Sequence, residues 1–216
     1  MPPHPPSDIT PKPHRRYAPR LPPSQRREQL IDAALSVIVQ QGYGGVSIEA
    51  IARSAGVTRP VIYDHFRNLG ELLQTLVERE EAYALAQLAE VVPDSPGDGD
   101  PAELFAAGVG RFLRAVAARP QTWRIILLPL DGTPAIVRHH VETNRAQVLG
   151  RIEGLVRWAI ERLRIPSDVD IELCARAIRN LSEDAGRMVL TDRERFSPER
   201  YQHFVLAVMR LILSER

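Results

Sequence analysis

The stretch Ser47–Phe66, SIEAIARSAGVTRPVIYDHF, decides the fold. Its first half carries apolar residues at the i, i+3, i+4 and i+7 spacing of one buried helical face, namely Ile48, Ile51, Ala52 and Ala55. Ser47 can accept a hydrogen bond from a free backbone N–H at the start of this helix. Gly56 tolerates the positive φ that a tight turn between helices requires. The stretch therefore predicts two short helices joined by a turn.

The second helix has one apolar side and one polar side. We expect Thr58 to cap it, and Pro60 falls in its first turn, where a missing N–H costs nothing. Ile62 and Phe66 lie one turn apart and point toward the same side as Val57. The other face then carries Arg59, Pro60, Tyr63 and Arg67. Such a face suits the major groove of DNA and its flanking phosphates.

A longer run carries a family resemblance. Residues 50–73, AIARSAGVTRPVIYDHFRNLGELL, resemble the N-terminal domain of the TetR/AcrR family of one-component regulators, and the match extends from about Ser24 to Leu76. The resemblance is specific because the Ala-Gly-Val-Thr turn, the Tyr-x-His-Phe end and the spacing back to Gly42 occur together. It implies an all-α protein, with a three-helix DNA-binding domain containing the helix-turn-helix and a larger helical domain for ligand binding and dimerisation. The implied DNA-binding residues are Ser47, Thr58, Arg59, Pro60, Tyr63 and Arg67.

Two positions depart from the family pattern. Many relatives have a lysine after the Asn that precedes the fourth helix, where this chain has Leu69. Arg67 and the backbone N–H groups at that helix start can supply the phosphate contact instead. Asp64 is the second departure, since phosphates repel a carboxylate unless it pairs with Arg67 or accepts from a cytosine amino group. Asn68 and Glu71 have the spacing of a capping box.

Composition narrows the class of protein. The chain has 216 residues, 44% of them hydrophobic and 25% charged, with a net charge of +1, as in an ordinary globular protein. The single cysteine, Cys174, excludes an internal disulfide and fits a reducing compartment. No apolar run approaches the roughly 20 residues needed to span a bilayer. We therefore expect a cytoplasmic protein with no membrane partner.

We expect three parts along the chain. Residues 1–23 should form a disordered, basic, Pro-rich arm, which is either a solvated tail or an extra DNA contact through Lys12, Arg15, Arg16 and Arg20. Residues 24–70 should form the DNA-binding domain. Its first helix begins after Ser24 as N-cap and ends where Gly42 adopts a left-handed conformation. Residues 71–216 should form the effector-binding and dimerisation domain.

The larger part reads as helices throughout. We expect one helix from Leu69 to about Val92, a break at the linker PDSPGDGDP, and further helices near residues 102–118, 120–128, 134–164, 168–190 and 198–214. Thr133-Pro134, Ser167 with Asp170, and Ser197-Pro198 are N-terminal signals for the last three helices.

A ligand pocket is expected among these helices. A stripe at four-residue spacing, Ile136, His140, Asn144, Val148 and Ile152, has two polar groups in an apolar face. Buried polar groups need partners, so His140 and Asn144 face either a group in the core or a ligand. With Phe112 and Trp123 they form the candidate effector site. The last two helices carry more apolar residues than they need internally, so we expect a homodimer through them.

The sequence bears on three classes of function. The leading one is a sequence-specific regulator, a repressor that a small-molecule effector releases from a palindromic operator. The alternative within this class is a constitutive regulator without an effector. An enzyme is disfavoured: His139, His140 and Glu142 lack the i, i+4 spacing of helical metal sites, and no nucleophile elbow or phosphate loop is present. We therefore expect no catalytic residue, no metal and no cofactor.

Overall fold

The computed structural model describes residues 21–91, 97–128, 132–165 and 168–214. The expected arm lies almost wholly outside the described residues, as do Ser167 and part of the linker after Val91. In the described part the chain forms α-helices and one 3-10 turn, with no strand, so the all-α prediction is confirmed. The elements are α1 (Pro23–Gln41), η1 (Tyr43–Gly45), α2 (Ile48–Ala55), α3 (Arg59–Tyr63), α4 (Leu69–Val91), α5 (Pro101–Ala118), α6 (Pro120–Leu127), α7 (Ala135–Leu163), α8 (Ile171–Thr191) and α9 (Pro198–Ser214).

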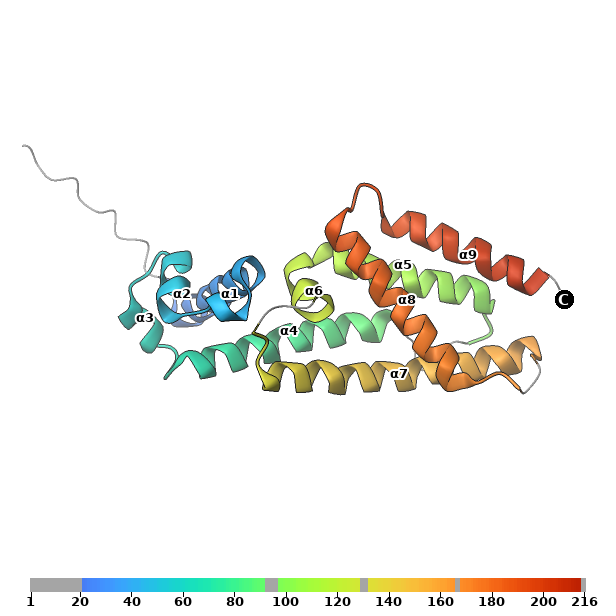
Figure 1. The fold of residues 1–216 in the computed structure, drawn as a ribbon, viewed down its shortest axis with the longest axis horizontal. Coiled ribbons are helices and arrows are strands. Elements are labelled where there is room, and N and C mark those ends of the chain that lie inside the picture. The colour runs from blue at the N-terminus through green and yellow to red at the C-terminus, as the bar shows by residue number, and fades with distance from the viewer. Residues whose placement is uncertain (1–20, 92–96, 129–131, 166–167, 215–216) are drawn as a thin grey trace, which may run out of the picture.

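The molecule is elongated (Figure 1). Helices α1 to α3 form one end, and α5, α8 and α9 form the other. Helix α4 runs from the first end into the middle of the molecule, α7 runs from the middle toward the other end, and α6 lies at the junction of the two ends. Any change in the direction of α4 therefore moves one end relative to the other.

Some helix boundaries follow the expected capping residues and others differ: α7, for example, begins at Ala135 after Pro134 as N-cap, with no side-chain cap from Thr133. Asp170 accepts a hydrogen bond from the Leu173 N–H, and Ser197 accepts one from the Arg200 N–H, so both cap as predicted. Helix α1 begins at Pro23 rather than after Ser24, because proline is well suited to the first helical position. Gly42 has a positive φ of 70° but an extended ψ of 175°, so the left-handed helical conformation expected there is wrong.

The first of two apolar cores joins both parts of the chain. It contains buried residues of α1, α2 and α3, including Ile31, Ile51 and Ile62, and continues into α4. Val137 of α7, 4% exposed, also belongs to this core. Just before α7, a Cβ at Gly132 would lie only 3.0 Å from the backbone nitrogen of Gly44 in η1. The small N-terminal unit therefore packs directly on the start of α7.

The second core lies between the far half of α4 and helices α5, α6 and α8. Its aromatic centre is the pair Phe112 and Trp123, whose rings meet edge to face with centroids 5.2 Å apart. Leu113 and Val116 are fully buried beside them. Part of this core, including Phe112 and Trp123, lines the cavity described below.

One buried group in the first core predicts a stability change. The hydroxyl of Tyr43 has no hydrogen-bond partner among the described residues, and burial raises the pKa of Tyr43 to about 12. We expect Tyr43→Phe to raise the free energy of unfolding by about 1 kcal/mol, because it removes a buried polar group without a partner. The native protein should also lose stability as the pH rises from about 10 to 12, since an unfolded tyrosine ionises near 10. The variant should lack this part of the alkaline loss.

Urea denaturation at neutral pH and at pH 11 measures both effects. Tyr83→Phe is the matched control, because Tyr83 lies at the surface of α4 and is 38% exposed. A Tyr43→Phe protein less stable than the native one would show that the hydroxyl has a stabilising partner.

Candidate nucleic-acid interface and ligand cavity

The helix-turn-helix has the predicted local structure. Ser47 accepts a hydrogen bond from the Ala50 N–H at 3.1 Å, and Gly56 adopts the left-handed conformation with φ 66° and ψ 31°. Ile62 and Phe66 are buried at 0% and 1% exposure. The expected side-chain cap from Thr58 is wrong, since its hydroxyl makes no capping hydrogen bond. Pro60 lies in the first turn of α3, where a backbone N–H would have no partner within the helix, so its absence costs nothing.

The predicted DNA-binding residues lie together at one end of the molecule. Ser47 is half-buried at the start of α2, and the exposed members of the set on or beside α3 are Thr58, Arg59, Pro60, Tyr63 and Arg67. Tyr63 is 50% exposed, which is unusual for a large aromatic side chain of a small domain. The structure thus presents a polar and aromatic helix face at the free end shown in Figure 1.

Both arginines of this face are held by carboxylates that the sequence did not single out for that role. Arg59 of α3 pairs with Glu49 of α2 at 2.9 Å, with both side chains at least half exposed. Arg67 pairs with Glu71 at 3.1 Å, and the same carboxylate accepts the Arg67 backbone N–H at 2.8 Å. These contacts lower the pKa of Glu71, the backbone hydrogen bond most of all. Exposed ion pairs are weak, so a phosphate can displace either carboxylate.

The start of α4 differs in one detail from the expected capping box. Asn68 Oδ1 accepts from the Glu71 N–H at 2.9 Å, as predicted. Glu71 reaches back to Arg67 rather than to the Asn68 N–H. Arg27 of α1 also has a role within the fold, because its guanidinium stacks over the Phe66 ring at 4.6 Å. Arg27 thus packs α1 against the end of the helix-turn-helix.

A cavity of about 290 Å³ lies between α4, α5, α6, α7 and α8. Its wall is mostly apolar, with Leu88, Phe105, Val109, Val148 and Ile152 among its members. All four residues predicted for the effector site line it, namely Phe112, Trp123, His140 and Asn144. The sequence reasoning therefore brought together residues that share one cavity.

Glu81 of α4 is a lining residue that the sequence reasoning missed. Its Oε2 lies 2.9 Å from His140 Nδ1, and its Oε1 accepts a hydrogen bond from Asn144 Nδ2. His140 and Asn144 thus have a partner group in the fold and also border the cavity, and their contact with a ligand stays a prediction. Glu81 is separated from His140 by 59 residues, and no local pattern links them.

The residues next to Glu81 connect α4 to other helices. Glu80 is buried, with 2% of the residue exposed. Its carboxylate accepts hydrogen bonds from Thr122 Oγ1 of α6, at 2.5 Å, and from Arg79. Arg79 in turn pairs with Glu28 and Asp32 of α1, each at 2.8 Å. Three consecutive residues of α4 therefore contact α1, α6 and α7. We call Arg79, Glu80 and Glu81 the α4 triplet.

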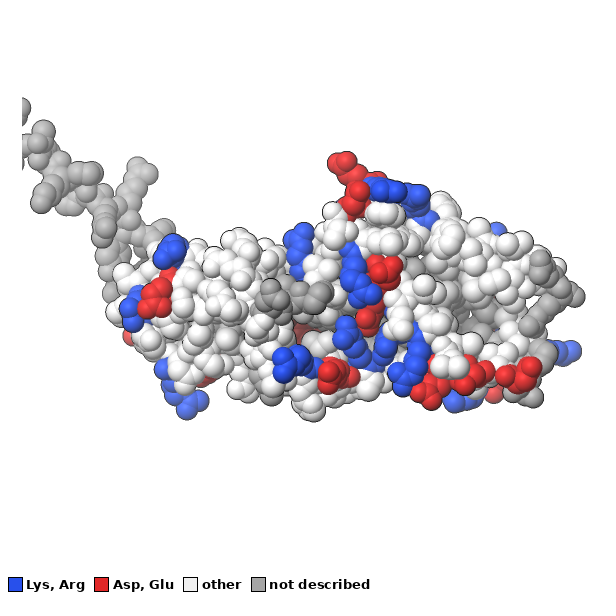
Figure 2. Space-filling view, viewed as in Figure 1, with Lys and Arg blue, Asp and Glu red and all other residues white. Residues whose placement is uncertain are grey.

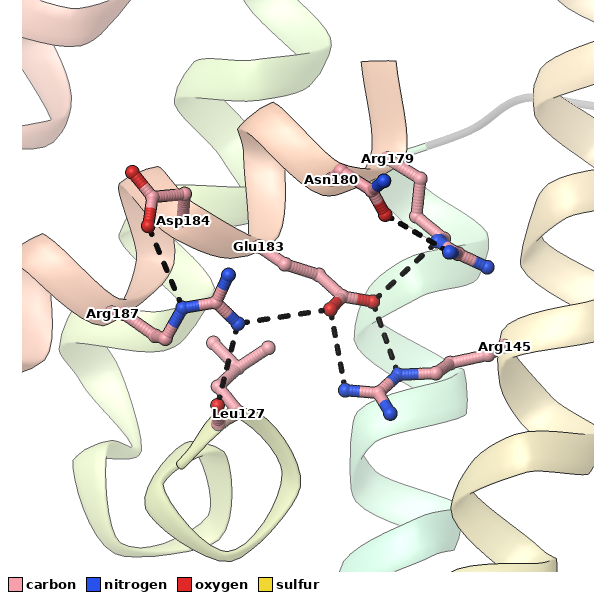
Figure 3. Close-up of polar contacts among 7 residues, drawn as sticks. All are labelled: Leu127, Arg145, Arg179, Asn180, Glu183, Asp184 and Arg187. Atoms are coloured by element: carbon pink, nitrogen blue, oxygen red, sulfur yellow. Dashed lines mark hydrogen bonds and ion pairs between the residues drawn. The ribbon is translucent and has the colours of Figure 1, made fainter. Parts of the chain in front are cut away.

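A second charged group borders the cavity from α7 and α8 (Figure 3). Arg145 donates two hydrogen bonds to Glu183, at 3.1 and 3.2 Å. Arg179 and Arg187 approach the same carboxylate at 3.7 and 3.8 Å, and Asp184 lies beside Arg187 on the outer side. One carboxylate thus faces three guanidinium groups.

The described part of the chain offers neither a metal site nor a membrane-spanning helix. It contains no group of three or more His, Cys, Asp or Glu side chains arranged to hold a metal ion. None of its helices is both long enough and apolar enough to cross a lipid bilayer.

Comparison with known proteins agrees with this architecture. Residues 30–76 match the model of the bacterial regulatory proteins of the tetR family. The chain is 45% identical over 162 residues to the HTH-type transcriptional regulator SrpR of Pseudomonas putida, covering 73% of this chain and 71% of that protein. It is 31% identical over 107 residues to the HTH-type transcriptional activator FasR of Mycolicibacterium smegmatis, covering 50% of this chain and about half, 48%, of that relative.

A solved structure has the same fold. The regulator FadR of Bacillus subtilis, in complex with stearoyl-CoA, superposes with a TM-score of 0.64 at 20% identity, covering 84% of this chain and 96% of that one. An exposed helix-turn-helix at one end of a helical body defines a DNA-binding transcription regulator. The chain belongs to the TetR/AcrR family.

Proposed function

We propose that this regulator is a repressor that binds a palindromic operator as a homodimer and leaves it when a small molecule enters the cavity. One observation carries the proposal: the exposed helix α3 lies at the N-terminal end of α4, and the C-terminal half of α4 lines the apolar cavity. The division into a DNA-binding part at residues 24–70 and an effector and dimerisation part at residues 71–216 is part of this proposal. So is its place in the cytoplasm, where the DNA is.

The DNA contacts follow from the exposed face of α3. Tyr63, Thr58 and Pro60 meet base edges and the thymine methyl in the major groove. Arg59, Arg67 and the hydroxyl of Ser47 contact phosphates. Ser47 still has its O–H to donate, because it uses only an oxygen lone pair as a helix cap. One short helix reads few base pairs, so two copies about 34–36 Å apart are required.

The effector acts by shifting an equilibrium. A ligand in the cavity favours the dimer state whose walls fit it best, and it can shift the equilibrium only by its differential affinity for the two states. The bound stearoyl-CoA of the structurally similar FadR supports a small-molecule ligand in a cavity of this fold. The relative FasR is named an activator, so the direction of control is tested separately.

The dimer uses the apolar faces of α8 and α9. The exposed large apolar residues on these helices are Leu173, Leu181, Phe204, Leu211 and Ile212, each between 58% and 72% exposed. Figure 2 shows that the surface over α9 carries few charged side chains, while charges gather over α7 and the middle of α8. Two copies that pack these faces together bury the apolar residues in an isologous four-helix contact.

We expect Leu181→Asp to convert the dimer into monomers at micromolar concentration, because a carboxylate buried in an apolar interface has no partner. Size-exclusion chromatography with light scattering measures the mass. Leu21→Asp is the matched control, since Leu21 is also exposed but precedes α1 at the other end. A Leu181→Asp protein that stays dimeric would move the interface elsewhere.

A footprint on the DNA upstream of the protein's own and neighbouring genes, at two salt concentrations, tests the proposal as a whole. We expect a protected inverted repeat. Protection that no small molecule in a thermal-shift screen can release would favour the constitutive regulator instead, and transcription assays on the same DNA distinguish repression from activation. A footprint that shows nothing beyond nonspecific, salt-sensitive binding would contradict operator recognition.

A further inference from the structure

The charged residues of the cavity wall differ in how fully they are paired. Glu80 is already bonded to Arg79 and Thr122, and both oxygens of Glu81 accept from α7. These two carboxylates are occupied by protein donors. They leave the Glu183 cluster as the charged part of the wall where protein groups remain unpaired.

In that cluster the donors outnumber the acceptors. A guanidinium has five N–H donors. Among the described residues, Arg145 donates two hydrogen bonds to Glu183, and Arg179 donates one, to Asn180. The Nε of Arg179 is buried without a hydrogen-bond acceptor, and its contact with Glu183 at 3.7 Å is too long for one. The geometry in Figure 3 leaves guanidinium donors at the edge of an apolar cavity.

We propose that the cavity takes an apolar molecule that carries a carboxylate, and that Arg145 and Arg179 bind this carboxylate. The inference rests on the proposed function, in which the cavity holds the effector. A carboxylate matches the planar fork of an arginine and can accept two parallel hydrogen bonds from it. It supplies the acceptor that Arg179 lacks and balances the charge of a cluster in which three guanidinium groups face two carboxylates, Glu183 and Asp184.

The apolar part of the ligand lies along the rest of the wall. Most of the other lining residues are apolar, and they include Phe112 and Trp123. Entry of the carboxylate competes with Glu183 for Arg145, whose helix α7 also holds Glu81 through His140 and Asn144. Ligand binding at Arg145 therefore acts on the helix that contacts the α4 triplet.

The chain contains its own probe for this site. It has two tryptophans, Trp123 and Trp158, and both line the cavity. Tryptophan fluorescence of the full-length dimer is titrated with decanoate, decanol and decylamine, which share an alkyl chain and differ in the head group. We expect decanoate to bind at least tenfold more tightly than the other two.

Variants assign the carboxylate contact. Arg179→Gln should weaken decanoate binding about tenfold, because it removes one hydrogen-bonded ion pair, and it should leave decanol binding unchanged. Arg145→Gln should behave alike, so the result does not depend on the folding of one variant. Arg176→Gln is the matched control, because Arg176 lies on α8 like Arg179 but is exposed and paired with Glu172. It should bind decanoate as the native protein does.

Three outcomes would overturn the inference: decanol binding as tightly as decanoate, decylamine binding most tightly, or no binding of any probe. None of these would affect operator binding in the footprint, so the proposed regulator would stand. If decanoate binds through Arg179 and the operator remains protected, the carboxylate site stands and release by an effector at this cavity is wrong.

Discussion

Replacing Tyr63 by alanine is expected to lower the affinity for the operator by roughly 100-fold or more while nonspecific binding persists. Tyr63 is half exposed on α3, whereas its neighbours Ile62 and Phe66 are buried in the first core. A base contact contributes about 1–3 kcal/mol, and a symmetric dimer loses it twice. Nonspecific binding rests on phosphate contacts, which this change leaves in place.

Electrophoretic mobility shift with the footprinted operator and with a scrambled sequence measures both affinities. Tyr83→Ala is the matched control, because Tyr83 is an exposed tyrosine of α4 that lies beneath the guanidinium of Arg119, away from the α3 face. Its operator affinity should equal that of the native protein. A Tyr63→Ala dimer that retains native affinity for the operator would remove Tyr63 from the recognition surface.

Replacing Arg79 by methionine is expected to lower the free energy of unfolding by about 3 kcal/mol, because it leaves the buried carboxylate of Glu80 without its cation. Thr122 still donates one hydrogen bond, which keeps the loss below that of a fully orphaned charge. The same change removes the pairing of α4 with Glu28 and Asp32 of α1.

Urea denaturation at fixed protein concentration measures the loss, since the stability of a dimer depends on concentration. Arg114→Met is the control: Arg114 is exposed on α5, its contact with Glu199 is 3.9 Å long, and its loss should cost less than about 1 kcal/mol. Arg79→Lys keeps the charge and should lie between the two. A cost for Arg79→Met equal to that of Arg114→Met would show that Glu80 does not depend on Arg79 as its partner in the fold.

Local patterns predicted the helix-turn-helix well because its determinants are close in sequence. The Ser47 cap, the left-handed Gly56 and the buried Ile62 depend on residues a few positions away. The capping role of Thr58 failed since the Thr58 hydroxyl makes no capping bond in this structure. The proline in the first turn of α3 instead fixes the backbone there.

The cavity could be predicted only in outline. The polar interruptions at His140 and Asn144 marked a face of α7, and that face does border the cavity. Their partner Glu81 comes from another helix, and the contacts of Arg79 with α1 span about fifty residues of sequence. Side-chain periodicity carries no information about which helices meet, so such pairs emerge only from the packed structure. The site roles of all these residues stay predictions.

The burial of Val137 in the first core has a consequence for protein engineering. A hybrid regulator can be made by joining the DNA-binding domain of one chain to the effector domain of another at the start of α4. In this chain such a junction would separate α1 from Val137 and Gly44 from the close approach of Gly132. A DNA-binding domain joined to another effector domain would lose its own contacts at Val137 and at Gly132. A working hybrid should therefore take the start of α7 and the turn before it from the same chain as the DNA-binding domain.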